Sequence, residues 1–311
     1  MVHQSASKRK TIITIIFLMF LLALVVAFTT FAILKLLNPP AKTDDTAEPE
    51  EVIIEEPEEP EPIQEINFQP IVDDWVNTVD GNKGIMIYDL DLEKIAGAYN
   101  TEAKFQTASL YKLFVVYEGY RRLQNGTWSR DDVAGWTRKT IPECLDLAIR
   151  ESNSPCAETL WNMIGHDELN WIVQNDFGLP DVYVNGLSAT TTEIMFIMKR
   201  FYEHPDITDE DLVAQMEDSF LNQPITTYDW RQGLPSGFSD RVNVYNKVGW
   251  NFNGSYWTIY DDASILDFVN EERHFIVVIM TNNIHFRLIR QFGADLESSF
   301  YHQYVLKNWD Q

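Results

Sequence analysis

The sequence contains few cysteines, few histidines and few basic residues, and each shortage excludes a class of protein. Two cysteines in 311 residues cannot build a disulfide-rich scaffold or a four-cysteine zinc site. The six histidines form no HExxH pattern and no pair at ligand spacing near a cysteine, so we expect no metal and no cofactor. Lysine and arginine total 24 against 47 aspartates and glutamates, and the net charge of -23 disfavours a nucleic-acid partner because it repels phosphate.

The sequence is not short of apolar residues: 45% are hydrophobic and 13% aromatic. A chain of this length and content can bury a sizeable core, as one large domain or two small ones.

One apolar run, residues 11–37, carries a single charge, Lys35, near its end. About 20 apolar residues cross a bilayer as a helix, so this run is long enough to be a transmembrane anchor. Basic residues lie in the preceding segment 1–10, and the positive-inside rule makes that segment a cytoplasmic tail. A cleaved signal peptide is the alternative, although its apolar core is usually about 7–15 residues long. We expect a single-pass protein of the cell membrane whose lipid contact is this helix.

Residues 38–67 are acidic and rich in proline. Positions 41–66 hold eleven acidic residues and one lysine. Such a segment cannot bury enough apolar surface to fold, and its charges keep it extended. It is predicted to be a disordered stalk that holds an extracytoplasmic domain, residues 68–311, away from the membrane.

The pattern within 68–311 is that of a mixed α and β domain. Strands are predicted at 84–90, 95–99, 242–248, 256–268 (with one interruption) and 275–281. Helices are predicted at 110–123, 143–151, 156–164, 167–176, 192–203, 209–221 and 284–306. The order predicts an α/β (α+β) fold, in which helices flank an antiparallel sheet of about five strands and an all-helical lobe is inserted after the second strand.

Ser109 and Lys112 open the first long helix of this domain. Residues three apart share a helix face, so the two side chains can touch. A serine at a helix N-terminus lies where backbone dipoles favour negative charge, and a lysine that accepts its proton makes it a nucleophile. The S-x-x-K pattern is weak by itself, because a helix-capping serine beside a solvated lysine is common.

Two further motifs follow in order: Ser152-Asn153-Ser154 before a predicted helix, and Lys247-Val248-Gly249-Trp250 at a strand end. With Ser109-Leu110-Tyr111-Lys112 they resemble the S-x-x-K, S-D-N and K-T-G signature of the penicillin-recognising serine hydrolases, in particular the class A β-lactamase-like enzymes. The resemblance spans roughly residues 84–281. It implies a β-lactamase/transpeptidase-like fold.

The resemblance also implies a role for each matched residue. Ser109 would attack a carbonyl carbon to form an acyl-enzyme, with Lys112 as general base. Lys247 would lower the proton affinity of Lys112 by charge repulsion, and Ser152 would relay a proton to the leaving nitrogen. The backbone N–H groups of Ser109 and Trp250 would form the oxyanion hole. Substrate would bind along a strand edge, at Ser154, Val248, Gly249 and Trp250.

Departures from the family pattern bear on activity. Ser154 replaces an asparagine and Val248 replaces a hydroxyl residue, so each can lose a contact with substrate. Segment 177–188 lacks the glutamate that activates the deacylating water in class A β-lactamases, and Asp181 is its only carboxylate. A penicilloyl-enzyme should therefore be long-lived. Unranked candidates for holding the substrate carboxylate are Arg273, Arg287 and Arg290.

Cys144 and Cys156 flank Ser152 and face an oxidising compartment in the predicted topology. A disulfide between them would close a short loop and brace the second motif. Two free buried cysteines are the alternative, because a sequence does not give the Cα separation.

These observations favour an extracytoplasmic serine acyl hydrolase similar to D-alanyl-D-alanine carboxypeptidases, acting on D-Ala-terminated peptides of peptidoglycan. The first alternative is a class A-like β-lactamase that hydrolyses β-lactams. The second, suggested by Ser154 and Val248, is a catalytically degraded homologue that binds peptidoglycan or a membrane partner.

Overall fold

The computed structural model describes residues 63–225, 228–252 and 257–309, which belong to one structural unit. The predicted cytoplasmic tail, the predicted anchor and nearly all of the predicted stalk lie outside these ranges. No helix within the described ranges is long and apolar enough to span a bilayer.

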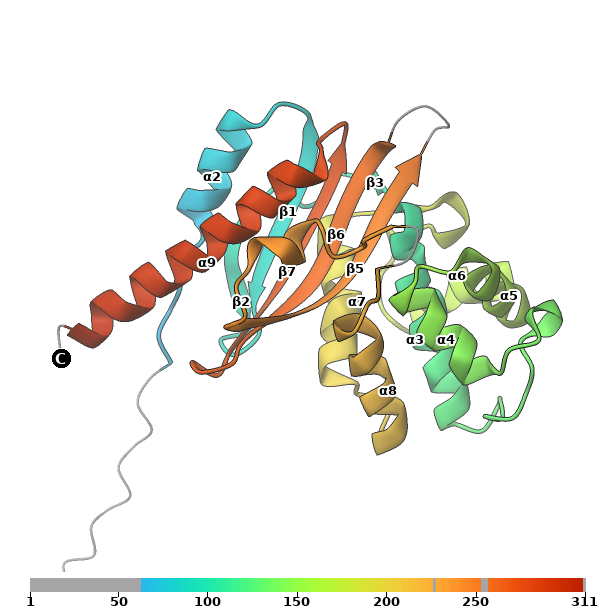
Figure 1. Ribbon diagram of the computed structural model, residues 1–311. Coiled ribbons are helices and arrows are strands. Elements are labelled where there is room, and N and C mark those ends of the chain that lie inside the picture. Colours follow the sequence, from blue (N-terminus) through green and yellow to red (C-terminus); the bar gives the residue numbers. More distant parts are fainter. Residues whose placement is uncertain (1–62, 226–227, 253–256, 310–311) are drawn as a thin grey trace, which may run out of the picture. The chain divides into compact units, whose positions relative to one another are not determined.

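A five-stranded antiparallel sheet lies at the centre of this unit (Figure 1). Its order is β2 (Lys94–Tyr99), β1 (Asn82–Asp89), β7 (Arg273–Asn282), β6 (Trp257–Phe268) and β5 (Val242–Phe252). The predicted sheet is confirmed, and the strand expected to be interrupted is the single strand β6. Since β5 is at the end of this order, its outer backbone edge is not covered by another strand of the sheet.

Helices cover both faces of the sheet (Figure 1). On one face lie α9 (Phe286–Trp309) and α2 (Gln69–Thr78), a helix that was not predicted. Only two side chains of α2, Val72 and Trp75, are buried. Two buried positions are too few to show a helical periodicity in the sequence. The other face carries the predicted helical lobe: α3 (Tyr111–Gln124), α4 (Ile141–Arg150), α5 (Ser154–Ile164), α6 (His166–Asn175), α7 (Thr191–Glu203) and α8 (Glu210–Leu221).

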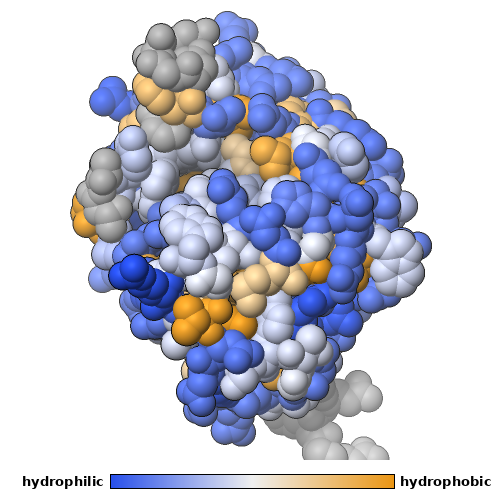
Figure 2. Space-filling model, turned by 90° about the vertical axis from the view of Figure 1, so that its right-hand side faces the viewer, coloured by the Kyte–Doolittle hydropathy of each residue, from blue (hydrophilic) through white to orange (hydrophobic). Residues whose placement is uncertain are grey.

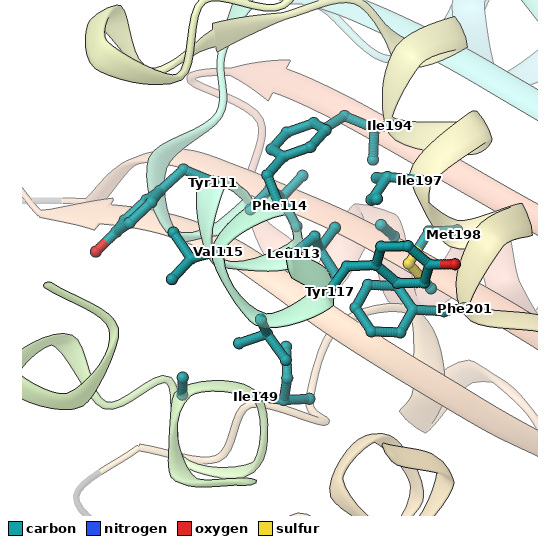
Figure 3. Close-up of a cluster of buried hydrophobic side chains, with 14 of the residues drawn as sticks. Tyr111, Leu113, Phe114, Val115, Tyr117, Ile149, Ile194, Ile197, Met198 and Phe201 are labelled. Atoms are coloured by element: carbon teal, nitrogen blue, oxygen red, sulfur yellow. The ribbon is translucent and has the colours of Figure 1, made fainter. Parts of the chain in front are cut away.

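Strand β7 is buried on both faces, which explains its unbroken apolar sequence. Side chains alternate along a strand, so Ile276 and Val278 join the core under the lobe while Val277 and Ile279 join the core under α2 and α9. In the lobe, α3 is the central helix: its residues pack against Ile149 of α4 and against α7 (Figure 3). This packing fixes α3, whose N-terminus directly follows the turn that carries Ser109.

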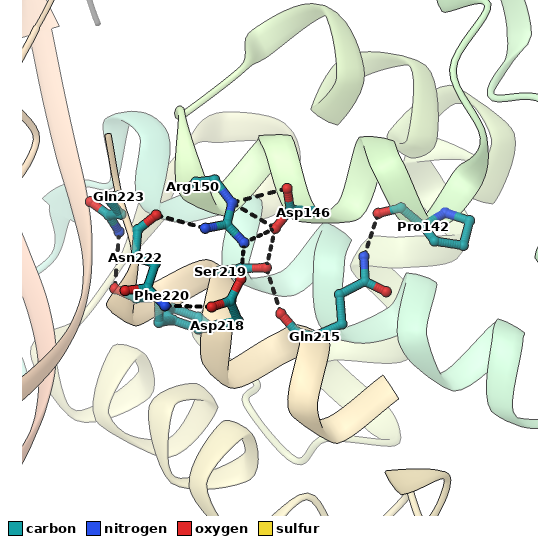
Figure 4. Close-up of polar contacts among 9 residues, drawn as sticks. All are labelled: Pro142, Asp146, Arg150, Gln215, Asp218, Ser219, Phe220, Asn222 and Gln223. Carbon is teal, nitrogen blue, oxygen red and sulfur yellow. Dashed lines mark hydrogen bonds and ion pairs between the residues drawn. The ribbon is translucent and has the colours of Figure 1, made fainter. Parts of the chain in front are cut away.

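A polar network joins α4 to α8 beside the sheet (Figure 4). Arg150 pairs with Asp146 on its own helix at 2.7 Å and also with Asp218 on α8. Arg150 also donates to the carbonyl oxygen of Asn222 at 2.6 Å, and the next residue, Gln223, donates to the carbonyl oxygen of Asn246 on β5 at 2.5 Å. The network therefore connects the end of α4, where the Ser152 turn starts, to the strand that carries Lys247.

The face drawn in Figure 2 is largely hydrophilic, with hydrophobic residues in small separate patches. This is the surface expected for a face in contact with water.

Candidate active site

Ser109 lies in a 3₁₀ turn, Ala108–Leu110, that leads directly into α3. Its hydroxyl oxygen accepts a hydrogen bond from Lys112 Nζ at 3.2 Å. The preceding residue, Ala108, has a φ of +41°, a conformation that L-residues rarely adopt. Strain of this kind persists only where the surrounding packing holds it in place, and it positions the adjacent serine.

Lys112 is fully buried and is held by the second motif. Its Nζ donates to the carbonyl oxygen of Ser152 at 2.5 Å, to Ser152 Oγ at 3.3 Å and to Ser154 Oγ at 3.1 Å. Ser152 lies in the turn between α4 and α5 with a φ of +53°. In this left-handed turn its carbonyl and hydroxyl groups both face Lys112.

Lys247 reaches the same hydroxyl from the sheet. Its Nζ donates to Ser152 Oγ at 2.9 Å and to the carbonyl oxygen of Val248 at 2.8 Å. Ser152 Oγ thus lies between the two lysine Nζ atoms, and a chain of hydrogen bonds runs from Ser109 through Lys112 and Ser152 to Lys247. The three motifs predicted that these four residues form one site, and their side chains do lie together in the structure.

The lysines are deprotonated more easily than free lysine. Burial lowers the pKa of Lys112 to about 7, against a smaller upward effect of Glu158. Burial also lowers the pKa of Lys247 far below its ordinary value, and repulsion from Lys112 adds to this. Neither lysine forms an ion pair with a carboxylate of the described residues. The main cause for Lys112 is therefore burial, and not the repulsion from Lys247 on which the sequence-based interpretation relied.

Gly249 brings the Ser109 turn close to the edge strand. A Cβ atom at this position would lie 2.5 Å from the carbonyl oxygen of Thr107 and 2.8 Å from Leu110 Cγ. The two elements approach so closely only because this residue has no side chain.

Gly249→Ala should displace the Ser109 turn and slow acylation by a penicillin about 10- to 100-fold, since small misplacements of reacting groups are costly. Stopped-flow acylation rates measure this. Ser129→Ala, at an exposed loop position, is the control. Equal rates for Gly249→Ala and wild type would show that the close approach is not needed.

Val248 and Trp250 point away from the lysines. Their side chains are buried in the core under α2 and α9, on the opposite face of β5 from Lys247. The side chain of Val248 is 1% exposed and packs in this core, so it offers no group to a ligand. Both residues can meet a ligand through backbone atoms at the edge of β5, as the oxyanion-hole assignment of Trp250 requires.

Cys144 on α4 and Cys156 on α5 form a disulfide, with Cα atoms 4.9 Å apart. Both are buried. The bond closes the loop that contains the Ser152 turn.

The loop between α6 and α7 provides no glutamate to the site. Its carboxylate Asp181 pairs with Lys104 at 3.2 Å, and both side chains are more than half exposed. Glu193, at the start of α7, caps that helix by accepting from the backbone N–H of Thr190. Neither carboxylate contacts Ser109 or Lys112.

Arg273 is not available to hold a substrate carboxylate, because its guanidinium pairs with Asp89 and with Asp91. Arg287 and Arg290 are exposed on α9. A cation that the sequence pattern did not single out, Arg231, donates to Oδ1 of Asn246, the residue before Lys247, at 3.3 Å. Its position in the segment between α8 and β5 was the available signal.

Glu158 is a second residue that the sequence pattern did not identify. It is an exposed residue of α5, one turn after Ser154, so the two side chains share a helix face. Burial has the largest effect on both neighbouring groups: it lowers the pKa of Lys112 and raises that of Tyr111. The charge of Glu158 has the next largest effect and raises both pKa values. Its i+4 spacing from Ser154 would have identified it.

Glu158→Gln should move the acidic limb of the pH–rate profile for acylation to lower pH, by roughly 0.3–0.5 pH unit. The carboxylate raises the pKa of Lys112, so its removal leaves more of the neutral base at a given pH. Acylation rates between pH 5 and 9 measure the shift, with Glu210→Gln on the exposed side of α8 as control. A shift to higher pH would contradict the expectation.

A family model described as "Beta-lactamase enzyme family" (Beta-lactamase2) matches residues 67–298. No curated protein matches the sequence.

Solved structures share the fold at low sequence identity. An ancestral (GNCA) class A beta-lactamase has a TM-score of 0.65 at 13% identity, covering 75% of this chain and 100% of its own. PBP-A has a TM-score of 0.63 at 15% identity, covering 75% and 95%. A beta-lactamase from Chitinophaga pinensis has a TM-score of 0.63 at 12% identity, covering 74% and 97%.

Proposed function

Because this chain belongs to the beta-lactamase enzyme family, we propose that it forms an acyl-enzyme on Ser109 from D-Ala-terminated peptides of the cell wall. The observation that carries the proposal is the hydrogen-bonded array of Ser109, Lys112, Ser152 and Lys247. The proposal also places the enzyme outside the cytoplasm, anchored in the membrane by residues 11–37.

Each residue of the array has one task in acylation. Ser109 Oγ attacks the peptide carbonyl carbon while its proton passes to Lys112 Nζ. The oxyanion is stabilised by backbone N–H groups of Ser109 and Trp250. The C–N bond then breaks, and Ser152 Oγ, hydrogen-bonded to both lysines, passes its proton to the leaving nitrogen while it takes up the proton held by Lys112 Nζ. Water completes the cycle by releasing the acyl group.

The state of the α6–α7 loop favours a peptide substrate over a β-lactam. Its Asp181 is engaged by Lys104 at the surface, so the loop supplies no base for a deacylating water. Hydrolysis of β-lactams remains the second candidate, favoured by the family match. A degraded binding homologue is disfavoured, because Ser154 Oγ still accepts a hydrogen bond from Lys112 Nζ at 3.1 Å.

The test is intact mass spectrometry of the full chain after mixing with benzylpenicillin. A persistent adduct of one penicillin is expected in wild type and in Ser129→Ala, which changes an exposed loop serine, but not in Ser109→Ala. An adduct on Ser109→Ala would disprove the nucleophile. Rapid hydrolysis without an adduct would favour a β-lactamase.

Substrate preference is tested separately, by release of the C-terminal alanine from a D-Ala-D-Ala peptide and from its L-Ala-L-Ala counterpart. Release from the first peptide alone, lost in Ser109→Ala, is the expected result. Acylation by penicillin without any release of D-alanine would refute the peptide assignment but not the nucleophile.

A further inference from the structure

A pocket separate from the Ser109 array lies between α7, α8 and the strands β5, β6 and β7. It encloses about 140 Å³, close to the roughly 150 Å³ that holds a benzene molecule in a protein interior. None of the residues that line it belongs to the three motifs. Its nearest approach to them is along β5, where Tyr245 precedes Lys247 by two residues on the same face of the sheet.

Aromatic side chains form much of the wall. Phe201 and Phe220 are buried, with ring centroids 4.9 Å apart. Tyr202 is 37% exposed and borders solvent, so the pocket is open to water at this side. Tyr245 adds a fourth ring, from the sheet. The faces of such rings are negative and attract cations.

Two carboxylates from different elements complete the wall: Glu217 on α8 and Asp267 on β6. Both lie within electrostatic range of the Tyr245 hydroxyl, whose pKa is raised by burial and then by Asp267 and Glu217. Glu217 is exposed and forms no ion pair with a described residue. Asp267 accepts from Asn243 Nδ2 at 3.1 Å.

The basic side chains nearby are engaged with acids. His274 also lines the pocket, but its Nδ1 lies 3.0 Å from Asp91, while its Nε2 is 3.7 Å from Asp267. Lys199 pairs with Glu203 and with Glu93. The pocket therefore keeps an excess of negative charge, carried mainly by Glu217.

We propose that this pocket binds a small organic cation of the alkylammonium class, with its charge facing Glu217 and Asp267 and its alkyl groups against the aromatic rings. The volume accommodates a group of about the size of tetramethylammonium or of a trimethylammonium head. Aromatic walls and carboxylates at the rim are the features that recognise such groups. The inference does not depend on the proposed hydrolase activity.

The test is an NMR titration of tetramethylammonium into the full chain in a non-ionic detergent, following the line width of its methyl signal. Saturable binding at one site is expected, at least tenfold tighter than binding of tert-butanol, a neutral molecule of similar shape. Glu217→Gln should weaken binding about fivefold, and Tyr245→Leu by a similar factor. Glu210→Gln, on the same helix outside the pocket, should bind as wild type does.

Glu217 is exposed, so Glu217→Gln should fold normally even if Tyr245→Leu does not. Equal binding of tert-butanol and tetramethylammonium would overturn the proposal, since the charge would not be recognised. If binding is saturable but neither Glu217→Gln nor Glu210→Gln changes it, the cation binds elsewhere, and the proposal is overturned as well. Absence of binding up to 100 mM tetramethylammonium would have the same meaning.

Discussion

Replacing Lys112 by methionine is expected to slow acylation of Ser109 about a thousandfold. Within the described residues, Lys112 Nζ is the group hydrogen-bonded to Ser109 Oγ, at 3.2 Å. A positioned general base contributes about 10²- to 10⁴-fold to such a step, and methionine cannot accept the proton. Acylation by a chromogenic β-lactam under single-turnover conditions measures the loss.

The same substitution is expected to stabilise the fold at neutral pH, by about 1–3 kcal/mol. Burial lowers the pKa of Lys112 from 10.5 to about 7, so the unfolded chain binds the proton more tightly than the folded one. The penalty is complete below about pH 7 and disappears as the pH rises towards 10.5. Methionine removes it, although the lost hydrogen bonds to Ser152 and Ser154 offset part of the gain.

Urea unfolding at several pH values separates the two effects. The stability difference between Lys112→Met and wild type should shrink as the pH is raised from 7 to 10. Lys139→Met, at an exposed position, should change neither acylation nor the pH dependence of stability. A Lys112→Met protein that is less stable than wild type at every pH would show that the buried ammonium is not penalised, and wild-type acylation would remove Lys112 from its role.

The sheet and the lobe could be predicted because their apolar patterns are long and regular. Strand β6 was harder, since Asp261 and Asp262 interrupt its apolar sequence. The structure accommodates both: Asp261 accepts from the backbone N–H of Thr281 at 2.7 Å, and Asp262 accepts from Ser264 Oγ at 2.9 Å. Burial raises the pKa of both carboxyls, that of Asp262 to about 7. Thr281 lies 20 residues from Asp261 along the chain, so this partner cannot be identified until the strands are paired.

The array of Ser109, Lys112, Ser152 and Lys247 could be predicted because three short motifs occur in order, each weak by itself. The direction of Val248 was also available from the sequence: on a strand it must point opposite to Lys247. The engagement of Arg273 was not available, because its partner Asp89 lies 184 residues away along the chain. The alternation of side chains along a strand can be inferred from the sequence. An ion pair between residues distant in sequence can be identified only once the fold is known.

Removing the Cys144–Cys156 disulfide, by Cys144→Ala together with Cys156→Ala, is expected to lower the free energy of unfolding by about 3 kcal/mol. The bond joins residues 12 apart in sequence, and a cross-link over a loop of this length restricts the unfolded chain by about that amount. Urea unfolding measures the loss. Dithiothreitol should destabilise wild type similarly and leave the double variant unchanged, and an unchanged wild-type midpoint in dithiothreitol would show that the bond does not contribute.

The disulfide should matter for acylation as well as for stability, because the residues that it encloses include Ser152. Ser152 holds Lys112 through its carbonyl oxygen and hydroxyl while in a left-handed conformation, φ +53°, which a chain without constraint seldom keeps. In the double variant the turn can relax and release Lys112, so acylation should slow about tenfold under conditions where the protein is still folded. Circular dichroism confirms folding in the same samples. An unchanged acylation rate would mean that packing of α4 against α5 holds Ser152 without the bond, and the disulfide would then serve stability alone.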